Sequence, residues 1–75
     1  MTLLERFQKL TWSKKIKLLR ESFELNQQEF ADKVGTTQKN VALWEKGKTN
    51  PRGMSRKAIC RALETTEEEI FGKVS

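Results

Sequence analysis

Two short helix-forming segments, each preceded by a capping residue and followed by a glycine, occupy the middle of this 75-residue chain. Asn26 with Glu29 three residues later has the form of a capping box, which predicts a helix from about Gln27 to Val34. Gly35 follows where a helix can end in a left-handed residue, a conformation that glycine adopts without steric cost. Isolated helices shorter than about 12 residues are marginal in water, so a helix of this length requires tertiary packing.

Thr37 predicts the N-cap of the second segment, which runs through Glu45, and Gly47 supplies its stop. Val41 and Trp44 are three residues apart, which places Trp44 in the core rather than on a surface where bases would stack. Two short helices joined by a tight turn that contains glycine are typical of a helix-turn-helix. Many helical corners share this pattern, so it predicts a local geometry more firmly than a function.

The segments before this pair predict two further helices. Apolar positions on one helical face of residues 2–10 predict a short leading helix that packs on the body. Either Thr11 or Ser13 can cap the next helix. Its apolar positions are Ile16, Leu19 and Phe23.

The last third of the chain also predicts helices and no strand. The apolar stripe of the first of them contains Met54, Ala58, Ile59, Ala62 and Leu63. Thr66 with Glu69 forms a second candidate capping box, just before the apolar pair Ile70 and Phe71.

One compact domain accounts for the length of the chain, because a second hydrophobic core would leave each half too small to fold alone. The helix pattern predicts an all-α domain of five helices, with an extra N-terminal helix as an option. We expect a single domain over residues 1–75, made of a core over residues 13–71 and an N-terminal extension over residues 1–12.

Charge is distributed unevenly along the chain, whose net charge is +5. From Lys33 to Arg61 there are eight basic residues and a single acidic one, Glu45. The glutamates that follow are Glu64, Glu67, Glu68 and Glu69. This polarity is expected when one face of a protein meets a polyanion such as a nucleic acid. A solvated basic surface explains the charge equally well, so charge alone does not decide.

Residues that catalysis requires are scarce. The chain has no histidine, no tyrosine and one cysteine, and it lacks a glycine-rich loop that would cradle a phosphate. Cys60 cannot form an internal disulfide or a zinc site by itself, and its place beside Ile59 favours a structural thiol. We therefore expect no enzyme activity, no metal, no cofactor and no small-molecule substrate.

No apolar run approaches the roughly 20 residues that span a bilayer. The first ten residues carry Glu5, Arg6 and Lys9, where a signal peptide would need an unbroken apolar stretch. We therefore expect a cytoplasmic protein without a membrane partner.

The stretch LNQQEFADKVGTTQKNVALWEKGKTNP resembles the DNA-binding domain of lambdoid phage repressors and Cro proteins, members of the xenobiotic-response-element class of helix-turn-helix regulators. The resemblance extends from about Ile16 to Phe71. It implies a five-helix, lambda-repressor-like domain that binds double-stranded operator DNA as a homodimer and represses or activates nearby promoters. A phage or bacterial repressor, located at the nucleoid, is the first interpretation. The second is an antitoxin or adaptor of the same fold whose main partner is a protein.

The resemblance also assigns roles to residues of the second short helix. Those implied to read bases in the major groove are Thr37, Gln38, Lys39, Asn40 and Leu43. Gln38 has the strongest claim, because it projects at the helix tip and a glutamine can pair bidentately with adenine. For Lys39, a phosphate contact or plain solvation is nearly as good an interpretation as a base contact.

A further set is implied to contact the DNA backbone or the minor groove: Asn26, Gln27, Lys46, Lys48, Thr49 and Arg52. Gln27 begins a helix, where the partial positive charge of the N-terminus favours a phosphate. Arg52 follows Pro51 and fits insertion into a narrow minor groove. The resemblance further implies a structural ion pair between Arg20 and Glu45, which joins two helices.

Two positions depart from the family pattern. Glu24 and Glu64 stand where many relatives have glycine at a helix end, so we expect less tight corners or another cap there.

Phe23 and Phe71 fit a core or a subunit interface equally well. The segment before Thr11 can pack, dimerise or remain free.

Overall fold

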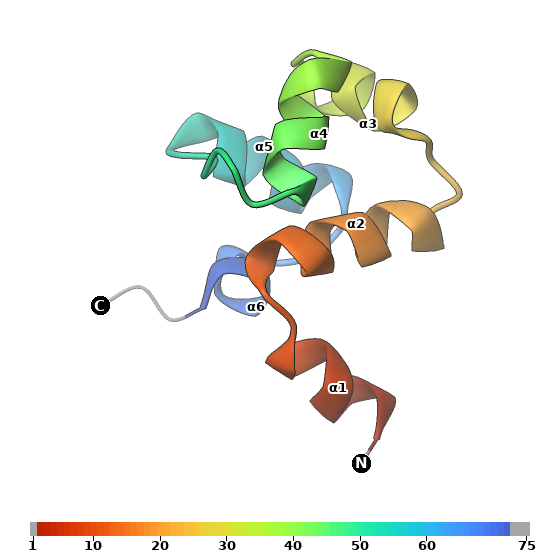
Figure 1. Ribbon diagram of the computed structural model, residues 1–75, viewed down its shortest axis with the longest axis vertical. Coiled ribbons are helices and arrows are strands. Elements are labelled where there is room, and N and C mark those ends of the chain that lie inside the picture. The colour runs from red at the N-terminus through yellow and green to blue at the C-terminus, as the bar shows by residue number, and fades with distance from the viewer. Residues whose placement is uncertain (1, 73–75) are drawn as a thin grey trace.

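The computed structural model of this protein describes residues 2–72, and all regular structure in that range is α-helical. The helices are α1 (Leu3–Lys9), α2 (Trp12–Ser22), α3 (Gln27–Val34), α4 (Gln38–Glu45), α5 (Met54–Ala62) and α6 (Glu67–Phe71) (Figure 1). This order confirms the predicted all-α class, with five helices preceded by a short N-terminal one. No helix within the described range is both long and apolar enough to cross a membrane.

The two short helices α3 and α4 begin and end as their sequence predicts. Asn26 Oδ1 accepts a hydrogen bond from the backbone N–H of Glu29 at 2.7 Å, and Glu29 Oε1 accepts one from the backbone N–H of Asn26 at 2.9 Å. Gly35 ends α3 with a φ of 86°. Thr37 Oγ1 caps α4 by accepting from the N–H of Asn40 at 3.2 Å. These bonds satisfy donors that an α-helix leaves without partners at its start.

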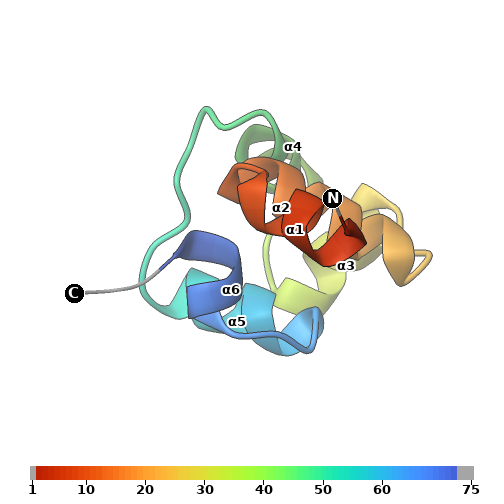
Figure 2. The same ribbon diagram turned by 90° about the horizontal axis from the view of Figure 1, so that it is seen from below.

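Side chains from α2 to α6 and their connections form one apolar core. Its largest fully buried members are Phe30, Ile16, Ile59, Leu63, Ile70 and Val41. Trp44 is 4% exposed, which confirms that it is a core residue, whereas Phe23 at the end of α2 is 38% exposed. Figure 2 shows α5 and α6 side by side along one edge and α4 toward the opposite edge. Because α3 and α4 pack on this core, two helices too short to be stable alone are held at a fixed angle.

Two local predictions in the C-terminal part are wrong in detail. Met54 is the first residue of α5 and is 86% exposed, so the apolar stripe that packs begins only at Ala58. Thr66 Oγ1 accepts from the N–H of Glu69 at 3.2 Å, but the Glu69 carboxylate accepts from the Thr65 hydroxyl at 3.0 Å. The capping box of α6 is therefore only half formed, because a nearby hydroxyl takes the carboxylate.

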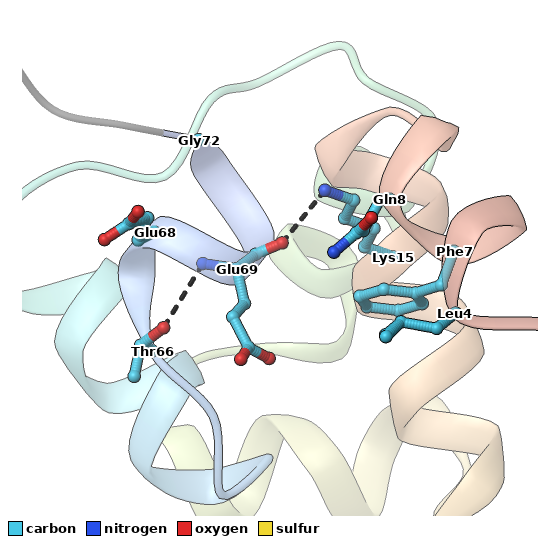
Figure 3. Close-up of a pocket in the computed structure, with 8 residues that line it drawn as sticks. All are labelled: Leu4, Phe7, Gln8, Lys15, Thr66, Glu68, Glu69 and Gly72. Carbon is cyan, nitrogen blue, oxygen red and sulfur yellow. Dashed lines mark hydrogen bonds between the residues drawn. The ribbon is translucent and has the colours of Figure 1, made fainter.

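The leading helix α1 forms as predicted, but none of its residues is buried. Leu3 and Leu4 are 84% and 66% exposed, and α1 projects from the body beyond α2 (Figure 1). It meets the body where the centroid of the Phe7 ring lies 5.4 Å from the Lys15 ammonium. That ammonium also donates to the Glu69 carbonyl at 2.9 Å, between α1 and α6 (Figure 3). The predicted packing of this helix is therefore confined to one edge of the body.

The two corners that carry glutamate in place of glycine remain tight. Glu24 and Glu64 adopt the left-handed conformation, with φ of 59° and 52°. At the end of α2 the N–H of Leu25 donates to the Arg20 carbonyl at 3.2 Å, and the corresponding bond closes α5 at 2.9 Å. Both helices thus end with the hydrogen bonds of a glycine-type C-cap. The expectation of looser corners or another cap is wrong.

Replacing Glu24 with glycine is expected to raise the free energy of unfolding by about 0.5–1 kcal/mol. A left-handed residue with a Cβ costs about 1–2 kcal/mol, and glycine removes that cost while it adds entropy to the unfolded chain. The melting temperature should rise by roughly 2–8 °C, measured by thermal denaturation. Glu21→Gly, which changes an exposed glutamate inside α2, is the matched control and should lower stability by about 1 kcal/mol. Equal destabilisation by both variants would contradict the backbone strain at Glu24.

Candidate nucleic-acid interface

The first residues of α3 and α4 lie in contact, because the turn at Gly35 folds the second helix back across the first. Gln38 Nε2 donates to Gln27 Oε1 at 2.8 Å. Around this bond lies a shallow depression of about 470 Å³, lined by Arg20, Asn26, Gln27, Gln28 and Gln38. Two helix N-termini, each with a partial positive charge, therefore open onto the same surface.

Arg20 and Glu45 form a buried ion pair that joins α2 to the end of α4. Arg20 Nε lies 2.6 Å from Glu45 Oε2, and Arg20 Nη2 donates to Glu45 Oε1 at 3.0 Å. Arg20 Nη1 donates to the Leu25 carbonyl at 2.7 Å. The two charged side chains are only 8% and 5% exposed. The hydrogen bond to Glu45 raises the pKa of the Arg20 guanidinium and outweighs the lowering by desolvation.

The ion pair determines how both glutamine side chains are oriented. A carboxylate has no donor, so Gln27 must present its Nε2 to Glu45, and it does so at 3.1 Å. The Gln27 carbonyl oxygen is then free to accept from the amide of Gln38, as the 2.8 Å bond shows. The result is a hydrogen-bond relay that runs from Arg20 through Glu45 and Gln27 to Gln38. The relay therefore allows only one of the two flip orientations of each carboxamide, because a flip would place an oxygen where an N–H group now donates to a partner.

Four of the five residues predicted to read bases are exposed at the N-terminal end of α4: Thr37, Gln38, Lys39 and Asn40. Asn40 Nδ2 donates to Thr36 Oγ1 at 3.0 Å, which holds this carboxamide near the turn. Leu43 lies one turn later and is half-buried, so it presents a smaller surface than the others. The structure therefore brings four of the five residues that were predicted to read bases together at one helix end.

The predicted backbone contacts fall into two groups. The members that follow α4 are exposed along residues 46–53, which join α4 to α5: Lys46, Lys48, Thr49 and Arg52. None of the three basic side chains forms a salt bridge with an acidic group within the described residues. Asn26 and Gln27 form the other group at the start of α3, where their side chains already bond within the protein.

Arg56 forms hydrogen bonds with two residues of the segment 46–53, and it is absent from the residues that the sequence singled out for the site. Its Nε donates to the Pro51 carbonyl at 2.7 Å, and its Nη2 donates to Asn50 Oδ1 at 2.9 Å. Its guanidinium carbon lies 4.2 Å from the centroid of the Phe71 ring. The centroid of the Trp12 ring lies 6.1 Å from that of Phe71, which is partly buried against the core. The only sequence signal at Arg56 is the basic character of the region, because these contacts depend on where α6 packs.

The cysteine has the properties of a structural thiol. Cys60 is 5% exposed, and burial raises the pKa of its thiol, which therefore stays protonated at neutral pH. Among residues 2–72, no group of three or more His, Cys, Asp or Glu side chains is arranged to hold a metal ion.

Comparison with known proteins identifies the family. Residues 16–70 match the helix-turn-helix family. An uncharacterized HTH-type transcriptional regulator of Archaeoglobus fulgidus is 35% identical over 57 residues, which cover 76% of this chain and 80% of the relative. The uncharacterized HTH-type transcriptional regulator YgzD of Bacillus subtilis is also 35% identical over 57 residues, which cover 76% of this chain and 86% of the relative.

A solved structure has the same fold. The crystal structure of the P22 c2 repressor protein, in complex with synthetic operator 9T in the presence of Tl+, matches with a TM-score of 0.82. The match covers 87% of this chain and 100% of that chain at 21% sequence identity, so it shows the fold alone. The family match over most of the chain and the two relatives above 30% identity show that this chain belongs to the helix-turn-helix family of transcriptional regulators.

Proposed function

We propose that this protein binds double-stranded DNA in a sequence-specific manner, with α4 in the major groove, and regulates transcription as a repressor. The relay that ends at Gln38 is the observation that carries this proposal. An exposed glutamine held in one orientation contributes little to the core, whereas it suits a contact that needs fixed geometry. Membership of a family of transcriptional regulators supports the same conclusion.

Gln38 is suited to read adenine. Its carboxamide has two N–H groups and one oxygen, and one N–H is held by Gln27 at 2.8 Å. The other N–H can donate to N7 of adenine while the oxygen accepts from the N6 amino group. Because Gln27 restrains the carboxamide, less side-chain freedom is lost when the base binds. The neighbouring base contacts come from Thr37, Lys39, Asn40 and Leu43.

Phosphates bind on both sides of α4 in this arrangement. The depression at the start of α3 offers backbone N–H groups of a helix N-terminus and the second amide N–H of Gln27. On the other side, Lys48 extends to the backbone and Arg52 enters a narrow minor groove. Such contacts set the position of the protein and add affinity, while the base contacts set the sequence preference.

Two copies occupy one approximately palindromic site. A single α4 exposes only about one turn of reading residues, which covers few base pairs. The centres of the half-sites then lie about one helical turn, roughly 10 bp, apart. The P22 c2 repressor, which shares this fold and was crystallised with a synthetic operator, supports operator binding by this chain.

Gln38→Ala tests the proposal. We expect the variant to lose about 1–3 kcal/mol of affinity for the preferred site and to relax selection at one base pair, because alanine offers neither donor nor acceptor. Non-specific affinity and the free energy of unfolding should stay nearly unchanged, since Gln38 is exposed. Selection from random duplexes gives the preferred site, and competition with all four base pairs at each half-site position measures the preference.

Gln8→Ala is the matched control, because Gln8 is an exposed glutamine of α1 outside the candidate interface. It should bind like the wild type. If Gln38→Ala keeps the full preference at every position, then Gln38 does not read DNA and α4 does not lie in the major groove as proposed.

A further inference from the structure

We infer that Arg56 is a positioning residue for DNA binding: it holds residues 46–53 in the shape that presents Lys48 and Arg52 to the DNA backbone. This inference rests on the proposed function and adds a residue that neither the sequence pattern nor the family comparison assigns to the site. Its evidence is the way in which α5 begins.

Helix α5 begins without the side-chain cap that starts each of the other described helices. The residues whose side chains accept a first-turn N–H are Thr2, Thr11, Asn26, Thr37 and Thr66. Gly53 precedes α5 and has no side chain that could do so. At this junction the backbone N–H of Ser55 donates to the Arg52 carbonyl at 3.0 Å, but no side chain of the segment 46–53 caps the helix.

Arg56 supplies a restraint from inside the first turn of α5. Its donation to the Pro51 carbonyl at 2.7 Å and to Asn50 Oδ1 at 2.9 Å fixes the two residues directly before Arg52. Pro51 is buried and its ring fixes φ, so Arg56 bonds to the segment at a residue whose backbone is itself rigid. Lys48 lies on the same segment, two residues before Asn50.

The guanidinium of Arg56 is anchored in the body of the protein at the same time. Its central carbon lies 4.2 Å from the Phe71 ring centroid, a distance at which a cation is attracted to an aromatic face. Phe71 packs beside Trp12, so α6 and the start of α2 support the contact. A planar guanidinium can stack on a ring while it donates two directed hydrogen bonds, which a lysine ammonium cannot do.

A segment ordered before binding loses less conformational entropy when it meets DNA. Arg56 therefore acts on DNA affinity through Lys48 and Arg52, and not through a phosphate contact of its own. This distinction can be measured, because a phosphate contact contributes to the salt dependence of binding and a positioning role does not.

The test compares Arg56→Leu and Arg56→Lys with the wild type. We expect both variants to bind the selected operator about tenfold more weakly, with the slope of log affinity against log salt unchanged. Amide hydrogen exchange of Lys48 and Ser55, whose N–H groups donate to the Leu43 and Arg52 carbonyls at the two ends of the segment, should become about tenfold faster when it is measured without DNA. Arg61→Leu removes the same charge from an exposed position of α5 and is the matched control, with wild-type exchange in this segment.

The alternatives give different results. A salt slope that becomes shallower by about one unit per copy in Arg56→Leu would show a direct phosphate contact and overturn the positioning role. Full rescue by Arg56→Lys would show that charge alone matters and would overturn it too, as would unchanged exchange or unchanged affinity in Arg56→Leu. A wild-type protein that binds no duplex DNA would instead remove the proposed function, and with it this inference, whatever the exchange shows.

Discussion

Replacing Glu45 with alanine is expected to lower the free energy of unfolding by about 3–5 kcal/mol. A domain of this size has a total stability of roughly 4–11 kcal/mol, so this loss removes between about a quarter of the stability and all of it. The physical reason is that the Arg20 guanidinium, whose side chain is 8% exposed, would remain buried without its counter-ion. Urea denaturation followed by circular dichroism measures the loss.

The double variant Arg20→Met with Glu45→Leu is the control for this prediction. Removal of both charges leaves no buried ion, so its stability should be close to that of the wild type or higher. A loss of less than about 1 kcal/mol in Glu45→Ala would contradict a buried pair, since exposed ion pairs contribute only that much.

The same double variant separates folding from DNA reading. It should fold, but Gln27 loses the carboxylate that accepts its Nε2, so the Gln27 carboxamide can flip and no longer fixes the orientation of Gln38. We expect non-specific DNA binding to be retained and the preference at the base pair read by Gln38 to weaken. A double variant that keeps the full preference would show that the relay does not orient Gln38.

Operator affinity is expected to fall by about 10³-fold between 50 and 200 mM salt. The basic side chains that we propose contact the DNA backbone are exposed on each copy: Lys46, Lys48 and Arg52. If each neutralises one phosphate in a complex of two copies, the slope of log affinity against log salt is about −5, because each contact contributes roughly −0.9. Titrations of a labelled operator at several salt concentrations measure the slope.

Lys48→Ala refines this prediction. It should weaken binding to all sequences alike and make the slope shallower by about one unit per copy. Lys9→Ala, in α1, removes the same charge outside the candidate interface and should leave the slope unchanged. A changed sequence preference in Lys48→Ala would reassign Lys48 to base contact. Binding to duplex DNA that hardly depends on salt would favour an adaptor whose main partner is a protein.

The ends of the two short helices could be predicted from the sequence because each end depends on residues within four positions of one another. The capping box of Asn26 and Glu29, the left-handed Gly35 and the cap at Thr37 all belong to this class. The core position of Trp44 also followed from local spacing, since a helical period of 3.6 residues places it on the same face as Val41.

The orientation of the Gln27 and Gln38 side chains could not be predicted from the spacing of residues in the sequence. Gln27 bonds to Gln38, which is 11 positions away, and to Glu45, which is 18 positions away. The pair of Arg20 and Glu45, 25 positions apart, was implied by the family resemblance and not by the pattern of residues. The roles of individual residues toward bases and phosphates stay predictions.

The sequence by itself thus determined where the central helices start and stop, which of their faces are buried and where the positive charge gathers. The tertiary structure decided that Glu24 keeps a left-handed backbone despite its Cβ, and that Arg56 reaches both Pro51 and Phe71. A cap is a bond between neighbours in the chain, so neighbouring residues are enough to predict it. Contacts such as those of Arg56 exist only after packing has brought distant helices together. The free energy of the same packing exceeds the backbone strain of about 1–2 kcal/mol that a left-handed conformation costs at Glu24.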